Sequence, residues 1–262
     1  MSFRSWDNKH LAKFNSAISS EFLDFYETFV DSKLREEAAK PSSRTFAASS
    51  FRCNRRSWFR IRGTTPDVAK VQDPVLKFSA DIGTACHRII QTNLRESLKA
   101  DWIDVSEYLK SILVDYEYEV MQDAESGEWQ VEVIRPYPIR FACDGIIKWN
   151  GVLYLLEIKT SDFESWKELT DPKDQHIDQA KCYSSLLKIH NVLFLYQDRQ
   201  FGGLKCYEIK FSDADSREVF ERFEYVMKMV DMNLAPEALP KGDVWCSPNR
   251  CPYYKKCGEY GR

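Results

Sequence analysis

The sequence has no run of apolar residues that approaches the ~20 needed to cross a bilayer. Its first ten residues, MSFRSWDNKH, lack the apolar core of a secretory signal peptide. We therefore expect a cytoplasmic protein without membrane contact. Cysteine is also scarce, because eight residues in a chain of 262 lie far below the ~8–10% of disulfide scaffolds. In a reducing compartment, clustered thiols more often bind metal than form disulfides.

The chain also lacks an excess of basic residues. It has 37 Lys and Arg against 40 Asp and Glu, a formal net charge of −3. No global positive charge draws the protein to nucleic acid, so an anion site must be a local patch. There is no internal repeat or low-complexity tract, and the ten Pro and ten Gly are scattered. These features predict one compact unit over residues 1–262.

The pattern of apolar residues changes from helical to strand-like along the chain. Helices are expected over 19–39, from Asp81 through Leu94, and over 104–122, 174–189 and 212–233, the last with a Ser212–Asp215 capping box. Strands are expected over 131–134, 139–149, 152–160, 192–197 and 204–211. The order predicts an α/β fold in which helices flank a mixed sheet, with an irregular tail from Pro236.

Asn150-Gly151 is the strongest hairpin signal in the chain. A two-residue turn there fixes a register in which Asp144 lies opposite Glu157, with Lys159 on the same face. Directly opposed residues hold their Cβ atoms ~4.5–5.5 Å apart, and like charges at that distance destabilise a sheet unless something neutralises them. A divalent cation would neutralise these two carboxylates.

An exposed strand face on which Lys159 pairs with Glu157 would explain the same residues without a metal. The neighbouring positions favour a buried site, however, because they are apolar on both faces. They are Ala142, Ile146, Leu153 and Leu155 on one face and Phe141, Ile147, Leu156 and Ile158 on the other. Charges in a sheet that is covered on both sides are costly unless they are paired or bound to metal, provided that no bulge shifts the register.

Asp144 followed by Glu157-Ile158-Lys159 resembles the Asp…(Asp/Glu)-X-Lys signature of the PD-(D/E)XK nuclease superfamily. Gly83-x3-His87 upstream and Gln179-x3-Tyr183 downstream make the chain similar to RecB-type nuclease domains. The resemblance implies an α/β, restriction-endonuclease-like core in which helices flank a mixed central β-sheet. It also implies metal-dependent hydrolysis of DNA.

The resemblance implies a set of metal ligands. Asp144 and Glu157 would supply hard oxygen ligands for Mg²⁺ or Mn²⁺. His87 would be a further ligand, and the main-chain carbonyl of Ile158 would complete the set. Taken without the resemblance, a lone histidine is more often a surface or core residue than a ligand.

Other residues acquire roles from the same resemblance. Lys159 would orient the attacking water and stabilise charge on the phosphate. Gln179 and Tyr183 lie four residues apart on one helical face and would organise the active site and the DNA strand, although an ordinary half-buried face has the same spacing. Glu132 is a weaker candidate for the acidic cluster, and His176 is expected to take no part.

Cys246, Cys251 and Cys257 lie in a proline-rich tail that is too irregular to fold by hydrophobicity alone. Together with the distant Cys53 they resemble the iron–sulfur branch of RecB-like nucleases, which implies a [4Fe–4S] cluster that fixes the tail to the N-terminal region. Structural zinc in the same cage is the alternative, and four unrelated thiols are a third possibility. The remaining thiols receive no role: Cys86, Cys143, Cys182 and Cys206.

Five arginines surround Cys53, with aromatic residues among them. Such segments grip single-stranded nucleic acid by phosphate contacts and base stacking, although a solvated helix face is equally common for a run of charge. If the segment binds DNA, loss of the cluster would unfold it and abolish binding. The predicted DNA contacts are Arg52, Arg55, Arg56, Trp58 and Arg60, with Arg62 and Phe59 beside them.

The expected protein is therefore a metal-dependent DNase that acts as an exonuclease on single-stranded or end-opened DNA, with possible partners in a replication or recombination complex. The alternatives are a structure-selective or CRISPR-adaptation-type endonuclease and a DNA-binding adaptor with a vestigial site. The chain lacks the G-x4-G-K-[ST] signature of a helicase motor. Within the single domain, the expected parts are a helical extension 1–44, a basic segment and helical flank 45–130, a catalytic α/β core 131–233 and a cysteine-rich tail 234–262 on the Cys53 region.

Overall fold

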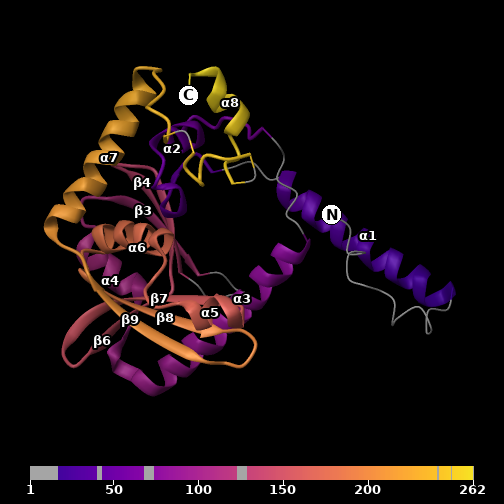
Figure 1. The fold of residues 1–262 in the computed structure, drawn as a ribbon. Coiled ribbons are helices and arrows are strands. Elements are labelled where there is room, and N and C mark those ends of the chain that lie inside the picture. The colour runs from indigo at the N-terminus through magenta and orange to yellow at the C-terminus, as the bar shows by residue number, and fades with distance from the viewer. Residues whose placement is uncertain are drawn as a thin grey trace.

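The computed structural model describes residues 17–39, 43–67, 74–122, 129–240, 242–248 and 250–261. The described helices are α1 (Ala17–Ala39), α2 (Asn54–Ile61), α3 (Pro74–Leu98), α4 (Val105–Ile112), α5 (Phe163–Glu168), α6 (Asp174–Leu187), α7 (Asp213–Asp231) and α8 (Tyr254–Glu259). None of them is both long enough and apolar enough to cross a membrane. The expected α/β class is confirmed, and Figure 1 shows helices packed around the strands while α1 projects from the body.

The strands form two sheets rather than the one central sheet that was expected. One has the order β1 (Phe46–Ala47), β5 (Ile139–Cys143), β4 (Trp129–Arg135), β3 (Glu117–Gln122). The other has the order β2 (Trp102–Ile103), β6 (Gly145–Trp149), β7 (Val152–Ser161), β8 (Asn191–Asp198), β9 (Leu204–Lys210). The expected continuous strand over 139–149 is therefore wrong. The chain leaves the first sheet at Asp144 and joins the second, because β5 pairs with β4 whereas β6 pairs with β7.

The β6–β7 hairpin has the predicted register. Asn150 and Gly151 have φ values of 50° and 81°, the positive values that a type I′ turn requires. Trp149 pairs with Val152, and the ladder continues to Gly145 opposite Leu156. Asp144 and Glu157 come next, one residue beyond the last pair.

Both faces of this hairpin are covered, as its apolar pattern predicted. Ile146 and Leu155 are fully buried in the main core. Leu156 and Ile158 belong to a second cluster with Ile90 of α3. The alternative of a solvent-exposed strand face is therefore wrong, since helices or sheet residues pack on either side.

Two helix boundaries differ from expectation. The helix expected over 104–122 ends at Ile112, and 117–122 form β3 instead. In this segment Tyr118 and Val120 alternate with Glu residues and pack against the core, so period-two burial against β4 prevails over helix formation. The helix expected from Asp81 begins earlier, at Pro74, a residue suited to the first helical turn. The capping box of α7 is confirmed, because Ser212 and Asp215 bond each other reciprocally.

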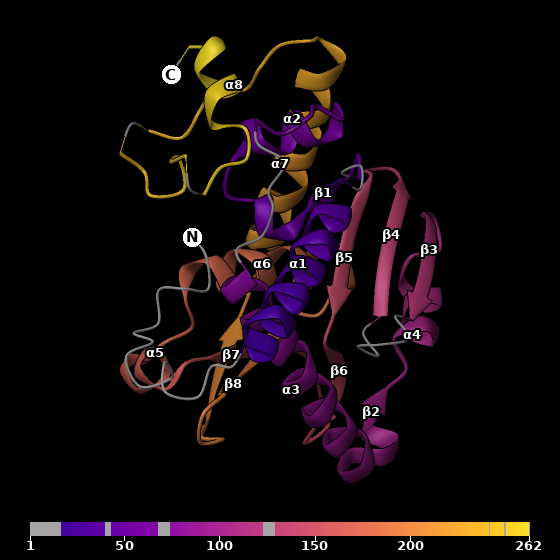
Figure 2. The ribbon, with the colours of Figure 1, turned by 90° about the vertical axis from the view of Figure 1, so that its right-hand side faces the viewer.

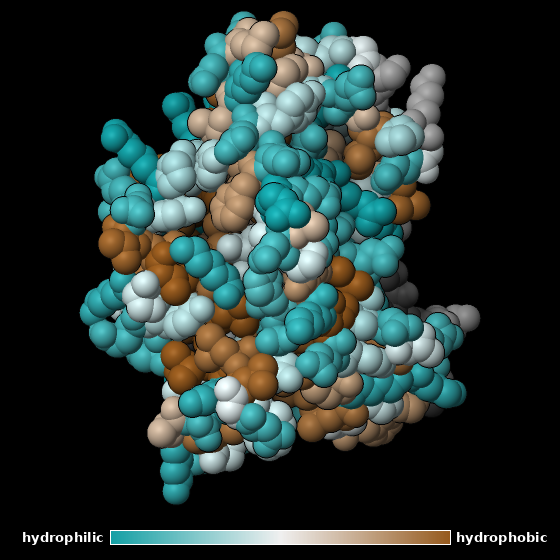
Figure 3. Space-filling view, turned by 90° about the vertical axis from the view of Figure 1, so that its left-hand side faces the viewer, coloured by the Kyte–Doolittle hydropathy of each residue, from teal (hydrophilic) through white to brown (hydrophobic). Residues whose placement is uncertain are grey.

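The C-terminal tail lies beside α2, as the two ribbon views agree (Figures 1 and 2). Phe59 stacks on Tyr253 with ring centroids 5.1 Å apart, and Trp58 meets Tyr260 edge-on at 5.4 Å. Asp67 accepts a hydrogen bond from the backbone of Lys255. Aromatic packing therefore joins the C-terminal tail to α2. On the face that lies at the left of Figure 1, separate hydrophobic groups lie among hydrophilic residues (Figure 3).

Candidate active site and cysteine cage

Asp144 and Glu157 are both removed from solvent, with exposed fractions of 8% and 1%. Asp144 is fixed by three contacts at the point where the chain changes sheets. Its Oδ2 accepts a hydrogen bond from the backbone N–H of Ile158 at 2.7 Å, and its Oδ1 lies 3.2 Å from Nδ1 of His87. Its main-chain carbonyl accepts from Gln91 at 2.7 Å. The carboxylate is thus tied to β7 and to α3.

Glu157 uses only one of its two carboxylate oxygens. Oε2 accepts a hydrogen bond from Nζ of Lys159 at 2.6 Å. Oε1 is buried and has no hydrogen-bond partner among the residues that the structure describes. A buried carboxylate oxygen without a donor is costly unless a cation or water binds it.

The charges of the site shift its pKa values in opposite directions. Burial raises the pKa of Asp144, but the hydrogen bond and charge of His87, together with the charge of Lys159, lower it by more. The net pKa of Asp144 therefore lies below its usual range. Burial raises the pKa of Glu157 to about 7, and the nearby charge of Asp144 adds to the increase against the opposing effect of Lys159. Burial lowers the pKa of Lys159, but both acids outweigh it, so the net pKa is raised. One acid therefore holds its charge firmly and the other titrates near neutrality.

The helix that carries His87 approaches β7 closely because of a glycine. A Cβ atom on Gly83 would lie 3.1 Å from Oγ1 of Thr160, which is tighter than most side-chain contacts. His87 lies one helical turn further along and contacts Asp144. The Gly83-x3-His87 spacing thus has a packing reason as well as a chemical one.

Gln179 and Tyr183 lie on the same side of α6, near the acids. Nε2 of Gln179 donates to the Tyr183 hydroxyl at 2.8 Å. Burial raises the pKa of Tyr183 well above its usual value, and the charge of Glu157 adds to the shift. The fold brings the pair to the edge of the acidic site.

His176 is a residue that the sequence interpretation set aside. It precedes Gln179 by one helical turn on α6, and its Nδ1 lies 2.7 Å from the Tyr196 hydroxyl. Burial, with the charges of Lys159 and Lys173, lowers the pKa of His176 to about 3. The sequence does hold a signal for including His176 among the site residues, because its spacing places it on the same helical face as Gln179 and Tyr183. Glu132, in contrast, pairs with Arg140 on the first sheet and does not join the acids.

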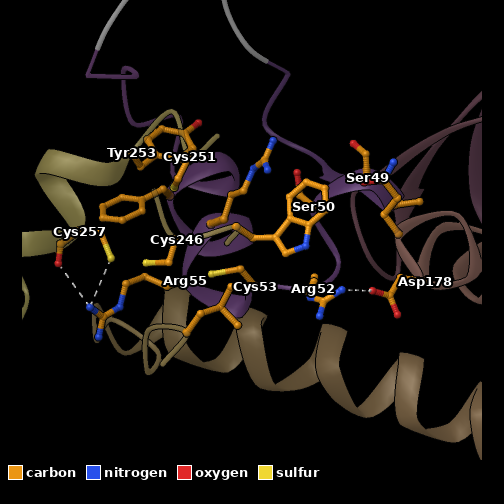
Figure 4. Close-up of a pocket in the computed structure, with 16 residues that line it drawn as sticks. Ser49, Ser50, Arg52, Cys53, Arg55, Asp178, Cys246, Cys251, Tyr253 and Cys257 are labelled. Atoms are coloured by element: carbon orange, nitrogen blue, oxygen red, sulfur yellow. Dashed lines mark hydrogen bonds and ion pairs between the residues drawn. The ribbon is translucent and has the colours of Figure 1, made fainter. Parts of the chain in front are cut away.

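Cys53, Cys246, Cys251 and Cys257 line one small cavity of about 40 Å³ between α2 and the tail (Figure 4). We call these four residues the cysteine cage. Burial raises the pKa of Cys53, and the charge of Cys257 adds to the increase. Burial likewise raises the pKa of Cys251, with smaller contributions from Cys53 and Cys257. Within the described residues no three Cys, His, Asp or Glu side chains converge closely enough to hold a metal ion.

The arginine segment differs from the expected DNA-binding surface. Arg55 is 5% exposed and donates to the carbonyls of Pro236 and Gly261 and to Sγ of Cys257. Trp58 is 1% exposed and its indole donates to the carbonyl of Met229. Both side chains are buried and donate hydrogen bonds to the C-terminal tail or to α7. The expectation that they contact DNA is therefore wrong.

The remaining arginines of the segment have different surroundings. Nε of Arg60 donates to the carbonyl of Thr45 at 2.9 Å, and the side chain is half-buried. Arg52 lies 3.8 Å from Asp178, an ion pair drawn in Figure 4. Arg56 lines an open hollow beside α6. Arg52 lines another open hollow on the same helix, together with Asp178 and Arg222.

Two hollows are lined by other predicted site residues. The first, of about 360 Å³, is bounded by α3 and the end of β7 and contains His87, Lys159 and Arg199. The second, of about 520 Å³, lies between α2, α6 and the tail. Its described lining consists of Ser49, Arg56, Gln175, His176, Gln179, Trp245 and Arg250.

No protein-family model and no curated protein matches the chain. Several solved structures align with the chain at low similarity. The crystal structure of SSO0001 aligns with a TM-score of 0.46 and 18% identity over 88% of this chain and 95% of that one. The structure of LHK-Exo in complex with dAMP aligns with a TM-score of 0.42 and 13% sequence identity, over 73% of this chain and 90% of that one. A structure of the alkaline exonuclease LHK-Exo from Laribacter hongkongensis aligns with a TM-score of 0.37 and 14% sequence identity, over 76% of this chain and 93% of that one.

Proposed function

We propose that the protein is a metal-dependent deoxyribonuclease that hydrolyses phosphodiester bonds, acting as an exonuclease on single-stranded or end-opened DNA. The observation that carries the proposal is the buried pair Asp144 and Glu157, in which Oε1 of Glu157 has no donor among the described residues. A lysine ammonium lies beside the same carboxylate. A divalent metal could bind the two carboxylates and the free Glu157 oxygen, and the lysine ammonium could contact a phosphate beside it.

The donor types of the site suit Mg²⁺ or Mn²⁺. Binding would have to bring them closer together, because no three acidic, histidine or cysteine side chains of the described residues converge on one metal position. Asp144 and Glu157 would hold the ion, with His87 and the carbonyl of Ile158 as further ligands. When bound, the ion would polarise the scissile phosphate and lower the pKa of a water molecule. The residues themselves prepare the site, because the Ile158 N–H holds one oxygen of Asp144 and orients the other toward His87.

Lys159 would orient the attacking water and stabilise the developing charge on phosphate. Its ammonium is held by Glu157 at 2.6 Å and its pKa is raised, so it is charged throughout the neutral range. The Gln179–Tyr183 pair offers a hydroxyl donor at the edge of the site. These groups would position a phosphate beside the acids without forming a covalent bond to it.

The cysteine cage would hold a [4Fe–4S] cluster, with structural zinc as the alternative occupant. Four thiols around one cavity suit either group. The other described side chains that line this cavity include no histidine or methionine. A brown protein with broad visible absorption and about four irons per chain supports the cluster. A colourless protein with stoichiometric zinc supports the alternative.

Cleavage assays test the function. Wild-type protein with Mn²⁺ or Mg²⁺ is expected to degrade linear single-stranded DNA and to leave closed circles intact, whereas Asp144→Ala is inactive. Glu132→Gln is the matched control, since Glu132 pairs with Arg140 away from the site. Cleaved circles would favour an endonuclease. Wild-type protein that binds DNA but has no more activity than Asp144→Ala would favour a non-catalytic adaptor.

A further inference from the structure

The hollow beside α6 has a lining suited to a polyanion. We call its seven lining residues, from Ser49 to Arg250, the tail groove. Arg56 and Arg250 bring two guanidinium groups to it, and no described lining residue is acidic. Neither arginine has an acidic partner among the residues that the structure describes. In a chain of net charge −3, this is a local cationic surface of the kind that binds phosphates.

The tail groove also contains an aromatic residue that is not buried in the core. Trp245 is half-buried, and the guanidinium carbon of Arg250 lies 5.1 Å from the centroid of its ring. The backbone N–H of Trp245 donates to Oδ1 of Asp243 at 2.8 Å, which fixes the loop locally. An aromatic ring beside a guanidinium is the combination that proteins use to stack a base and neutralise its phosphate.

The position of the tail groove connects the cysteine cage with the acids. Trp245 immediately precedes Cys246 of the cage, and both line the cavity drawn in Figure 4. At its other side the groove contains Gln179, which donates to Tyr183 beside Glu157. A strand lying in the groove would thus pass from the tail toward the acids.

We propose that the tail groove binds single-stranded nucleic acid, with Trp245 stacking on a base while Arg56 and Arg250 neutralise adjacent phosphates. This inference rests on the proposed nuclease function and names the subsite that would guide the strand to the acids. It gives the cysteine cage a role in recognition, because the cage fixes the loop that carries the stacking residue. It also replaces the buried Trp58 by an aromatic side chain that a base can reach.

Fluorescence anisotropy with the full chain tests the stacking, using a labelled oligothymidine of about 20 nucleotides and an abasic strand of equal length. No divalent metal is added, and the strands are recovered intact afterwards. Trp245→Ala is expected to weaken oligothymidine binding about tenfold and to leave abasic binding unchanged. Trp245→Phe retains most of the affinity. Trp149→Ala, at the distant β6–β7 turn and 53% exposed, is the matched control and binds as wild type does.

Arg250→Gln tests the phosphate contact independently. It is expected to weaken both strands alike and to reduce the slope of log affinity against log salt by about one. Arg217→Gln, on the exposed surface of α7, serves as its control. If Trp245→Ala does not fold, the Arg250 salt slope decides the matter, and an unchanged slope overturns the proposal.

Other results overturn the subsite directly. Trp245→Ala with wild-type affinity for oligothymidine, or with equal losses on both strands, excludes base stacking there. The two proposals fail separately: a chain that cleaves DNA without Trp245 dependence keeps the nuclease and loses the subsite. A chain that binds through Trp245 but cleaves no better than Asp144→Ala keeps the subsite and loses the nuclease. Wild-type protein that binds neither strand overturns the subsite, and the cleavage assay with Mn²⁺ then decides the nuclease separately.

Discussion

Lys159 donates to one oxygen of Glu157 at 2.6 Å while the other oxygen of that buried carboxylate has no donor in the described part of the chain. The pair is therefore half-satisfied. Its unused oxygen lies in the same site as Asp144, whose oxygens contact His87 and the Ile158 N–H. An incomplete polar network of this kind is expected where a ligand completes it.

Glu157→Gln is expected to abolish Mn²⁺ binding and to reduce cleavage at least about 100-fold, because a neutral amide is a much weaker ligand of a hard cation. Isothermal titration with Mn²⁺ and initial cleavage rates measure the two effects. The shape of the side chain is preserved, so the thermal midpoint should stay within a few degrees of wild type. Unchanged Mn²⁺ affinity would remove Glu157 from the ligand set.

Metal affinity should depend on pH near neutrality. The pKa of Glu157 without metal is raised to about 7, chiefly by burial, so the group is protonated below that pH and must lose its proton when a cation binds. Apparent Mn²⁺ affinity is expected to rise about tenfold per pH unit up to about 7 and then level off. Calorimetry at pH 6 in two buffers of different ionisation enthalpy should detect proton release, and its absence would contradict the shift.

His176 should stay neutral throughout the physiological range. Burial lowers the pKa of His176 to about 3, with help from Lys159 and Lys173. Its C2–H resonance is therefore expected to remain constant from pH 8 to pH 5, assigned by comparison with a His176→Gln spectrum. A titration near the ordinary value of ~6.5 would show that the imidazole is not enclosed beside Tyr196.

Gly145→Ala should destabilise the second sheet. The added Cβ would lie 2.7 Å from Cη2 of Trp102, so the indole must move, and overpacking of this kind costs about 1–3 kcal/mol. Urea unfolding measures the change in the free energy of unfolding. The same substitution in a Trp102→Leu background should cost less, because the obstructing ring is gone. Equal losses in both backgrounds would place the cost elsewhere.

The capping box of α7 should contribute to stability above acid pH. Hydrogen bonds from Ser212 lower the pKa of Asp215 to about 2, against a usual value of 3.8. Because the folded pKa is depressed, the stabilisation is fully present above about 3.8 and is lost as pH falls toward 2. Ser212→Ala is expected to cost about 1 kcal/mol at pH 7. Denaturant unfolding from pH 6 to pH 2 should show the difference between wild type and Asp215→Asn shrinking in that acid window.

Local sequence signals determined the parts of this protein that depend on near neighbours. Asn150-Gly151 specified the turn and the hairpin register, because both residues accept positive φ. Ser212 and Asp215 specified the start of α7 for an equally local reason. The acidic pair and its lysine followed from the same register, and the apolar residues around them correctly indicated burial.

The tertiary structure alone decided the rest. No local pattern shows that the chain changes sheets at Asp144, since both halves of 139–149 have the same strand character and only pairing partners separate them. The arginine segment likewise reads as a cationic surface, yet long-range contacts with the tail bury Arg55 and Trp58. Those same contacts leave Arg56 and Trp245 in an open groove. Exposure depends on which distant segments pack together, and that information lies in the fold rather than in any short stretch of sequence.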